Sequence, residues 1–358
     1  MRINKLDGLR GIFSIMIVLL NYPQEFIPDW FTYNFFIFES YVFVDFFFVL
    51  SGFVISYNYN VISSFAKLRE FLKKRLIRLY PLLLFTSTIF LLFPLISRLL
   101  FPSYFTTSYD YLQKLTGYIE TITFMNITPV LGDRQIINPP SWSISSEIMS
   151  YFLYGFVIYK FKKYAKVFFL FTIIISLCLL YVNGDYFDVS NFAAFRGFVG
   201  FNLGYFVYKF KKNKLKINSS WEWISILTMI AFMYILNTLD SKTFYGLLFG
   251  MFFIPTLFAL MIYIFIHSNG FISKTLSSKP LQYLGKISYS LYLNHFIIPI
   301  ILIQPLFTFF KIEKSASIEI IIFFFVLSIT ILYSHFTFKL IEKKLGQFLK
   351  EKYIKIIK

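Results

Sequence analysis

The 358-residue chain is 57% hydrophobic and 22% aromatic, but only 15% of its residues are charged. A soluble domain usually carries about 25% charged residues, so this composition excludes a disordered chain and argues against a soluble enzyme. The net charge of +17 would suit a nucleic-acid-binding protein, but with a mean hydropathy of +0.66 it favours an integral membrane protein with basic cytoplasmic loops. We therefore expect no nucleic acid partner, and the single cysteine, Cys178, excludes an internal disulfide and a cysteine-rich metal site.

Ten stretches of the chain are long and apolar enough to be considered membrane spans, because a helix needs about 20 mostly apolar residues to cross the hydrocarbon. The predicted fold class is therefore all-α, a polytopic transmembrane helix bundle of about ten spans. The expected spans cover 6–22, 36–57, 79–97, 141–159, 167–182, 192–208, 221–237, 243–266, 287–309 and 318–338.

The distribution of lysine and arginine predicts the orientation of these spans. With the N-terminus in the cytoplasm, 28 of the 35 basic residues fall in cytoplasmic segments and 6 fall in external ones. Cytoplasmic loops carry the excess of basic residues, so both termini are predicted to be cytoplasmic. We divide the chain into a membrane domain, 1–338, and a tail, 339–358. In the tail, apolar residues recur at helical spacing among lysines, which predicts a basic amphipathic helix lying on anionic membrane lipids.

Charged and polar residues interrupt the first two spans. Arg10 and Asn21 are 11 residues apart, which places them on one face of a helix. Ionisable groups at membrane depth are costly and usually mark a functional interior. Alternatively, Arg10 reaches lipid phosphate with Asp7 as its partner. Asp45 lies within an apolar run, where a structural ion pair and a catalytic role are equally plausible interpretations.

A cluster of cations precedes the third expected span. Arg75 and Arg78 share a helix face, and Lys74 shares one with Arg78. Two guanidinium groups at the cytoplasmic interface can grip a phosphate or a pyrophosphate. The bias of cytoplasmic segments toward basic residues explains the cluster equally simply, so both interpretations stay open.

Two further ionisable residues fall inside later spans. Glu147 lies nearly two turns into the fourth span and shares a face with Ser143. A buried carboxyl group there suits proton transfer or hydrogen bonding to a hydroxyl, although a structural pair is the alternative. His295 lies inside the ninth span, as a candidate base or as a hydrogen-bond partner between helices. The sequence has no P-loop and no His-Glu-x-x-His motif, and we expect no metal site.

Five blocks of the sequence, in order along the chain, resemble acyltransferase family 3, a family of integral membrane O-acyltransferases. The segment from Phe338 to Lys343 is similar to the family's closing segment. The five blocks are Leu6-Asp7-Gly8-Leu9-Arg10-Gly11, Phe46 to Phe53, Arg75 to Pro81, Ser141 to Glu147, and Leu284 to His295.

The resemblance implies a ten-span protein of the bacterial inner membrane that takes an acyl group, usually acetyl, from cytoplasmic acetyl-CoA. It implies transfer to a hydroxyl of a cell-envelope polysaccharide, such as O-antigen of lipopolysaccharide or capsule, or of its lipid-linked precursor. Arg75 and Arg78, with Lys74 beside them, would hold the CoA phosphates. Acetyl-CoA is then the acyl donor substrate, and no bound cofactor is expected.

The first span departs from the family pattern. The family carries an arginine and, 11 positions later, a histidine that acts as the catalytic base, whereas here Arg10 is followed by Asn21. An amide does not accept a proton at neutral pH, so Glu147 or His295 would have to take it. Two other functions remain open: a glycan or lipid transporter, such as a flippase, and a catalytically inactive acyltransferase-like protein.

Overall fold

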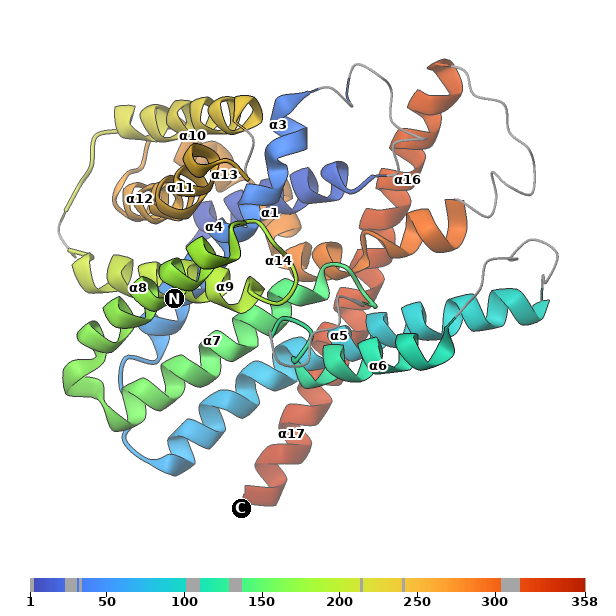
Figure 1. Ribbon diagram of the computed structural model, residues 1–358, viewed down its shortest axis with the longest axis horizontal. Helices are drawn as coiled ribbons and strands as arrows, with labels where there is room; N and C mark the ends of the chain where they lie inside the picture. Colours follow the sequence, from blue (N-terminus) through green and yellow to red (C-terminus); the bar gives the residue numbers. More distant parts are fainter. Residues whose placement is uncertain are drawn as a thin grey trace.

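The computed structural model describes residues 3–22, 31, 34–100, 110–128, 137–212, 215–239, 242–303 and 316–357. All regular secondary structure in these ranges is helical, as predicted (Figure 1). The longer helices are α1 (Asn4–Leu20), α4 (Phe43–Asn58), α5 (Phe65–Leu100), α6 (Tyr111–Thr123), α7 (Ser141–Lys160), α8 (Ala165–Asn183), α9 (Ala193–Phe210), α10 (Ser220–Thr238), α12 (Ile254–His267), α14 (Lys279–Asn294), α16 (Ala316–Thr337) and α17 (Gly346–Ile357). The short helices are α3 (Phe35–Phe38), α11 (Phe244–Leu248) and α13 (Phe271–Leu276).

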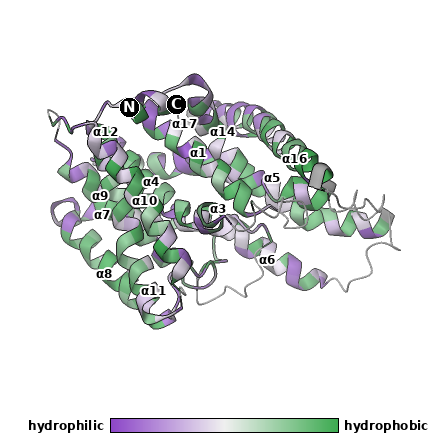
Figure 2. Ribbon diagram, turned by 90° about the horizontal axis from the view of Figure 1, so that it is seen from above, coloured by the Kyte–Doolittle hydropathy of each residue, from purple (hydrophilic) through white to green (hydrophobic). Residues whose placement is uncertain are grey.

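Six helical segments in the described part of the chain are long and apolar enough to cross a membrane. Figure 2 shows hydrophobic residues along α8 and α16, two of the helices in this set. The six segments are Phe35–Asn58, Phe65–Leu99, Lys162–Asn183, Ser220–Thr238, Phe244–His267 and Ile318–Lys352. The prediction of about ten spans is therefore met in part, and the full count stays a prediction.

Three of the other four expected spans correspond to α1, α7 and α9, which are shorter or more polar. The ninth expected span, 287–309, begins within α14, which ends at Asn294, and its residues 304–309 lie outside the described part of the chain. Helix α7 carries five serines and a glutamate in its 20 residues, and α9 carries a buried arginine. These helices are largely buried among the others, so their polar groups contact protein rather than lipid. Their low hydropathy accords with that inner position, and three of them, α1, α7 and α14, line the candidate site together with α4 and α5.

Glycines allow the inner helices to pack closely. A Cβ atom on Gly52 of α4 would lie 1.9 Å from the carbonyl oxygen of Phe201 in α9, and one on Gly285 of α14 would lie 1.9 Å from that of Asp7 in α1. Small residues at helix interfaces let backbones approach in this way within membranes. The glycines of the sequence blocks around residues 8, 52 and 285 therefore fix the distances between the helices that carry the site.

Helix α5 differs from its expected form. We predicted a span over 79–97 preceded by a cluster of cations, whereas one helix of 36 residues, Phe65–Leu100, includes the cluster and continues through Pro81 and Pro94. At 1.5 Å per residue it is about 54 Å long, which exceeds the roughly 30 Å of a bilayer's hydrocarbon core. The basic cluster and the span are thus parts of one continuous helix. This helix places the arginines at the interior of the bundle.

The tail is helical, as predicted, but it is continuous with the bundle. A π-helical segment, η6 (Phe338–Leu345), follows α16 directly, packs against α5 and α14, and leads into α17. Leu340, Leu345 and Phe348 are exposed on this part of the chain. Both chain ends lie at the upper edge of Figure 2, and contact between the tail and lipid stays a prediction.

Candidate active site

Two adjoining cavities lie among the inner helices. The narrower one has a volume of about 90 Å³ and the wider one about 370 Å³. Because four residues line both cavities, the two spaces are neighbours, and together we call them the passage. These shared residues are Arg10, Leu50, Val54 and Arg78. The charged and polar lining of the narrow cavity comes from α1, α4, α5, α7 and α14, five helices that are distant in sequence.

Glu147 is the carboxylate of the narrow cavity. Its Oε1 atom accepts a hydrogen bond of 2.6 Å from the Ser51 hydroxyl of α4 and a second one from the Tyr151 hydroxyl, one turn further along α7. The two hydroxyl oxygens are 3.0 Å apart, so the three groups form a closed triangle. Glu147 and Ser51 are half-buried, whereas Tyr151 is buried. A carboxylate held between two hydroxyl donors is oriented toward the passage and can accept a proton.

The serine-rich first turns of α7 set the position of Glu147. The helix begins where the Ser141 amide donates to the Asn138 carbonyl at 2.9 Å. Ser143 donates to the Tyr292 hydroxyl of α14 at 2.8 Å, and Ser146 donates to the Ala193 carbonyl at the start of α9 at 3.0 Å. These bonds fix α7 to helices on two of its sides, so Glu147 has little freedom to move relative to the cavity.

Arg75 and Arg78 both line the narrow cavity, as their shared helix face predicted. Arg75 donates to the Tyr59 hydroxyl at 2.9 Å, and its guanidinium lies 5.1 Å from the centre of that ring. The Arg75 Nε atom is buried and has no hydrogen-bond partner within the described part of the chain. Arg78 is surrounded by protein yet solvent-accessible, because its surface faces the two cavities. Both guanidinium groups therefore lie beside the narrow cavity, where the accessible surface of Arg78 can bind an anion.

Arg10 stands at the junction of the two cavities. Its side chain is 24% exposed, and its Nη1 atom lies 3.9 Å from Asp7 Oδ1, so the expected partnership within α1 is present. Across the wider cavity, Glu342 of η6 accepts a hydrogen bond of 3.1 Å from the Ser290 hydroxyl. Arg10 interacts electrostatically with both Glu147 and Glu342. Arg10 thus lies close to the carboxylates Asp7, Glu147 and Glu342. The cation can bind an anionic ligand, and the carboxylates limit the net positive charge inside the protein.

Three of the sequence-predicted site residues lie outside both cavities. The Asn21 side chain caps its own helix by donating to the Ile17 carbonyl at 2.9 Å. His295 is buried at the end of α14, and its Nδ1 lies 2.6 Å from the Tyr292 carbonyl oxygen. Lys74 is exposed and pairs with Glu70 at 2.5 Å. No histidine in the described ranges lines either cavity, so Glu147 is the candidate base that the structure places beside the arginines.

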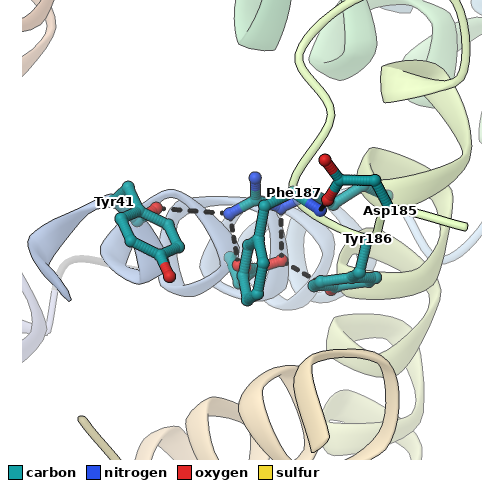
Figure 3. A network of polar contacts seen from close by, with 6 residues as sticks. Tyr41, Asp185, Tyr186 and Phe187 are labelled. Carbon is teal, nitrogen blue, oxygen red and sulfur yellow. Dashed lines mark hydrogen bonds and ion pairs between the residues drawn. The ribbon is translucent and has the colours of Figure 1, made fainter. Parts of the chain in front are cut away.

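Asp45 forms a structural ion pair, one of the two interpretations that the sequence left open (Figure 3). Arg196 of α9 binds both carboxylate oxygens, at 2.7 and 3.2 Å, and also donates to the Tyr41 carbonyl at 3.2 Å. The Tyr186 hydroxyl donates to the same carboxylate at 2.7 Å. The pair is almost completely buried, and the Arg196 guanidinium lies 5.3 Å from the centre of the Trp142 ring on α7. It therefore joins α4, α7 and α9 beside the cavity without lining it.

Three residues of the passage were not singled out from the sequence. Ser51 and Tyr151 complete the triangle with Glu147, and Glu342 lines the wider cavity. A signal existed for two of them: Ser51 is a polar residue in an apolar run, and Tyr151 follows Glu147 by one helical turn. Glu342 belongs to the tail that we had interpreted only as a membrane anchor, and the π-helical form of η6 accompanies its approach to the cavity.

A bundle of apolar helices enclosing three arginines and a hydrogen-bonded carboxylate defines an integral membrane protein with a polar internal site. Its family follows from comparison with known families, in which a model described as an acyltransferase domain matches residues 3–336. The chain belongs to this family, acyltransferase family 3, and the match extends from the start of α1 nearly to the end of α16.

Curated relatives agree with this family. Proteins from Staphylococcus aureus strains COL, MSSA476 and MRSA252, provisionally named O-acetyltransferases, are each 26% identical to the chain over 367 residues. The alignments cover 94% of this chain but 56% of each relative, so the chain spans little more than half the length of these proteins. No solved structure matches the chain at a significant level.

Proposed function

We propose that the protein is an O-acetyltransferase of the bacterial inner membrane, which transfers an acetyl group from cytoplasmic acetyl-CoA to a hydroxyl of a cell-envelope polysaccharide or its lipid-linked precursor. The observation that supports this best is the narrow cavity, in which one carboxylate, two hydrogen-bonded hydroxyls and three arginines converge. Membership of an acyltransferase family and the names of the curated relatives point to the same reaction class.

The arginines bind the anionic donor in this proposal. Arg78 is accessible from both cavities, and Arg75 has a buried Nε donor without a partner in the described part of the chain. Guanidinium groups bind phosphate oxygens through charge-assisted hydrogen bonds. The wider cavity, with Lys286 at its exposed edge, has room for the bulkier part of CoA, and the thioester then points past Arg10 into the narrow cavity.

Glu147 takes the proton in this proposal. A general base must lie within hydrogen-bonding reach of the group that it deprotonates, and Glu147 already accepts two hydroxyl hydrogen bonds in the cavity. His295 and Asn21 lack this access. The cations beside Glu147 stabilise the negative charge that develops on the carbonyl oxygen during acyl transfer.

Deleting the gene and measuring O-acetyl esters on the surface glycan by NMR tests the proposal. We expect the esters to disappear and to return with the wild-type gene. Complementation with Arg75→Ala/Arg78→Ala should fail, because loss of hydrogen bonds to charged groups worth about 1.5–3 kcal/mol each lowers donor affinity by at least roughly tenfold. Lys74→Ala on the same helix, outside both cavities, should restore the esters.

Two outcomes of this experiment would contradict the proposal. Unchanged esters in the deletion strain would show that another protein acetylates the glycan. Loss of the whole glycan from the surface, with unesterified and esterified precursor accumulating inside the cell, would instead identify a transporter.

A further inference from the structure

The Ser51 hydroxyl is a nucleophile candidate that the proposed function does not yet use. It lies on the wall of the narrow cavity, half-buried, with its oxygen 2.6 Å from Glu147 Oε1. An activated serine needs an adjacent base within hydrogen-bonding reach and a third group that orients the base. Tyr151 supplies the third group, because its hydroxyl donates to the same carboxylate oxygen. Ser51, Glu147 and Tyr151 therefore have the relationships of nucleophile, base and orienting residue.

Cations surround this triangle where negative charge would develop. Arg10 interacts electrostatically with Glu147, and Arg78 interacts with both Glu147 and Tyr151. All three arginines line the same cavity as Ser51. When a serine oxygen attacks a carbonyl, the carbonyl oxygen becomes anionic, and fixed positive groups nearby lower the energy of that state.

The size of the narrow cavity favours two successive reactions over one. A volume of about 90 Å³ holds roughly six to nine water molecules, at about 10–15 Å³ for each. This is enough for an acetyl group and the adjoining thioester, and it leaves little room for a sugar ring in the same cavity. If the acetyl group is first transferred to a residue of the protein, CoA and the acceptor need not occupy the cavity together. CoA can then leave before the acceptor hydroxyl reaches the acetyl group.

We propose that Ser51 is transiently acetylated, an inference that rests on the proposed acetyltransferase function. Ser51 Oγ attacks the thioester carbonyl and gives its proton to Glu147, the carbon–sulfur bond breaks, and CoA leaves as the thiol after taking that proton. The acceptor hydroxyl then attacks the serine ester and gives its proton to Glu147. The bond to Ser51 Oγ breaks, and Ser51 recovers the proton. The net reaction exchanges the thioester for a sugar ester with Glu147 and Ser51 unchanged.

The test incubates the purified full-length protein with radiolabelled acetyl-CoA in the absence of any acceptor. We expect up to one acetyl group per protein, together with an equal amount of free CoA thiol, and mass spectrometry should place the label on Ser51. Ser51→Ala should lower labelling at least tenfold. Ser56→Ala, a buried serine of the same helix that lines neither cavity, is the matched control and should be labelled like the wild type.

A second variant provides a signature that a merely structural serine would not produce. Ser51→Cys should be acetylated as a thioester, which neutral hydroxylamine cleaves far faster than the oxygen ester of the wild type. Size-exclusion chromatography and acetyl-CoA binding establish that each variant is folded.

Two results overturn the inference while the proposed function stands. One is acetyl-CoA-dependent esterification of a glycan by a wild-type protein that never carries label, and the other is label on Tyr151 or any residue other than Ser51. If the wild type neither binds acetyl-CoA nor releases thiol nor esterifies a glycan, the proposed function itself fails, and the inference fails with it.

Discussion

Glu147 is the residue whose chemistry can be tested most simply. Glu147→Gln keeps the size of the side chain and can keep hydrogen bonds with Ser51 and Tyr151, but it removes the ability to accept a proton. We expect acetylation to fall by about 10²–10⁴-fold, the range typical for loss of a general base, while acetyl-CoA binding changes little. Initial rates of thiol release and equilibrium binding on the same preparation measure the two effects.

The outcome for Glu147 needs a second carboxamide variant for comparison. Glu70→Gln removes an exposed carboxylate that pairs with Lys74 outside the cavities, and it should retain the wild-type rate. If Glu147→Gln is as active as Glu70→Gln, then Glu147 is a structural residue.

Asn21 stands where the sequence resemblance led us to expect a histidine, and its side chain caps α1 away from both cavities. Because the carboxylate of Glu147 is already in place, we expect Asn21→His to change the rate of acetylation by less than about tenfold, below the usual contribution of a general base. The ester content of the surface glycan, compared between strains at equal protein levels, measures this. An increase of a hundredfold or more in the rate of acetylation would mean that the wild-type chain lacks an effective general base.

The sequence predicted the cavity's charged residues better than its neutral ones. Arg10 and Glu147 could be found because a charge at membrane depth is costly, and Arg75 and Arg78 could be found because they share a helix face in a cation cluster. A serine is common in apolar helices, so only the three-dimensional contact with Glu147 distinguishes Ser51. His295 carried the same kind of signal as Glu147, but which helix faces meet is decided by packing that the sequence pattern does not contain.

At the scale of helices, the Asp45–Arg196 pair joins α4 to α9 beside the site. Asp45→Ala leaves a buried guanidinium without its carboxylate, which typically costs 3–5 kcal/mol, so we expect a large drop in the thermal unfolding midpoint in detergent. Asp45→Leu/Arg196→Met removes both charges and should recover most of the stability. A single variant as stable as the wild type, or a double variant less stable than the single, would contradict a structural role.

The helices also show where sequence patterns mislead. The span predicted over 79–97 starts where the hydropathy rises, but no glycine or proline interrupts the backbone before Pro81, so α5 starts earlier, at Phe65, and includes the basic cluster. The amphipathic tail is predicted to lie on lipid, which stays a prediction, and its π-helical segment in addition brings Glu342 within hydrogen-bonding distance of Ser290. In both cases composition changes along the chain while the helix does not end.

At the scale of the whole molecule, the bundle separates apolar outer helices from polar inner ones. Helices such as α8 and α10 expose most of their surface, whereas α7 and α9 are buried and polar. Four of the six apolar segments in the described part of the chain follow this division, whereas Phe35–Asn58 and Phe244–His267 are apolar and mostly buried. The passage lies among the inner helices. In the proposed function, acetyl-CoA enters it from one side of the membrane and meets the glycan hydroxyl there.

The measurement that tests the central claim most directly is acetyl transfer by the purified protein in sealed vesicles, with a lipid-linked glycan in the bilayer. Acetyl-CoA is supplied on one side at a time, and O-acetyl esters on the glycan are quantified by mass spectrometry. We predict esters only when acetyl-CoA is present on the side that carries the lysine-rich segments, and none with Arg75→Ala/Arg78→Ala. Glycan that crosses the bilayer without gaining esters, or stays unmodified with acetyl-CoA on both sides, would contradict the account.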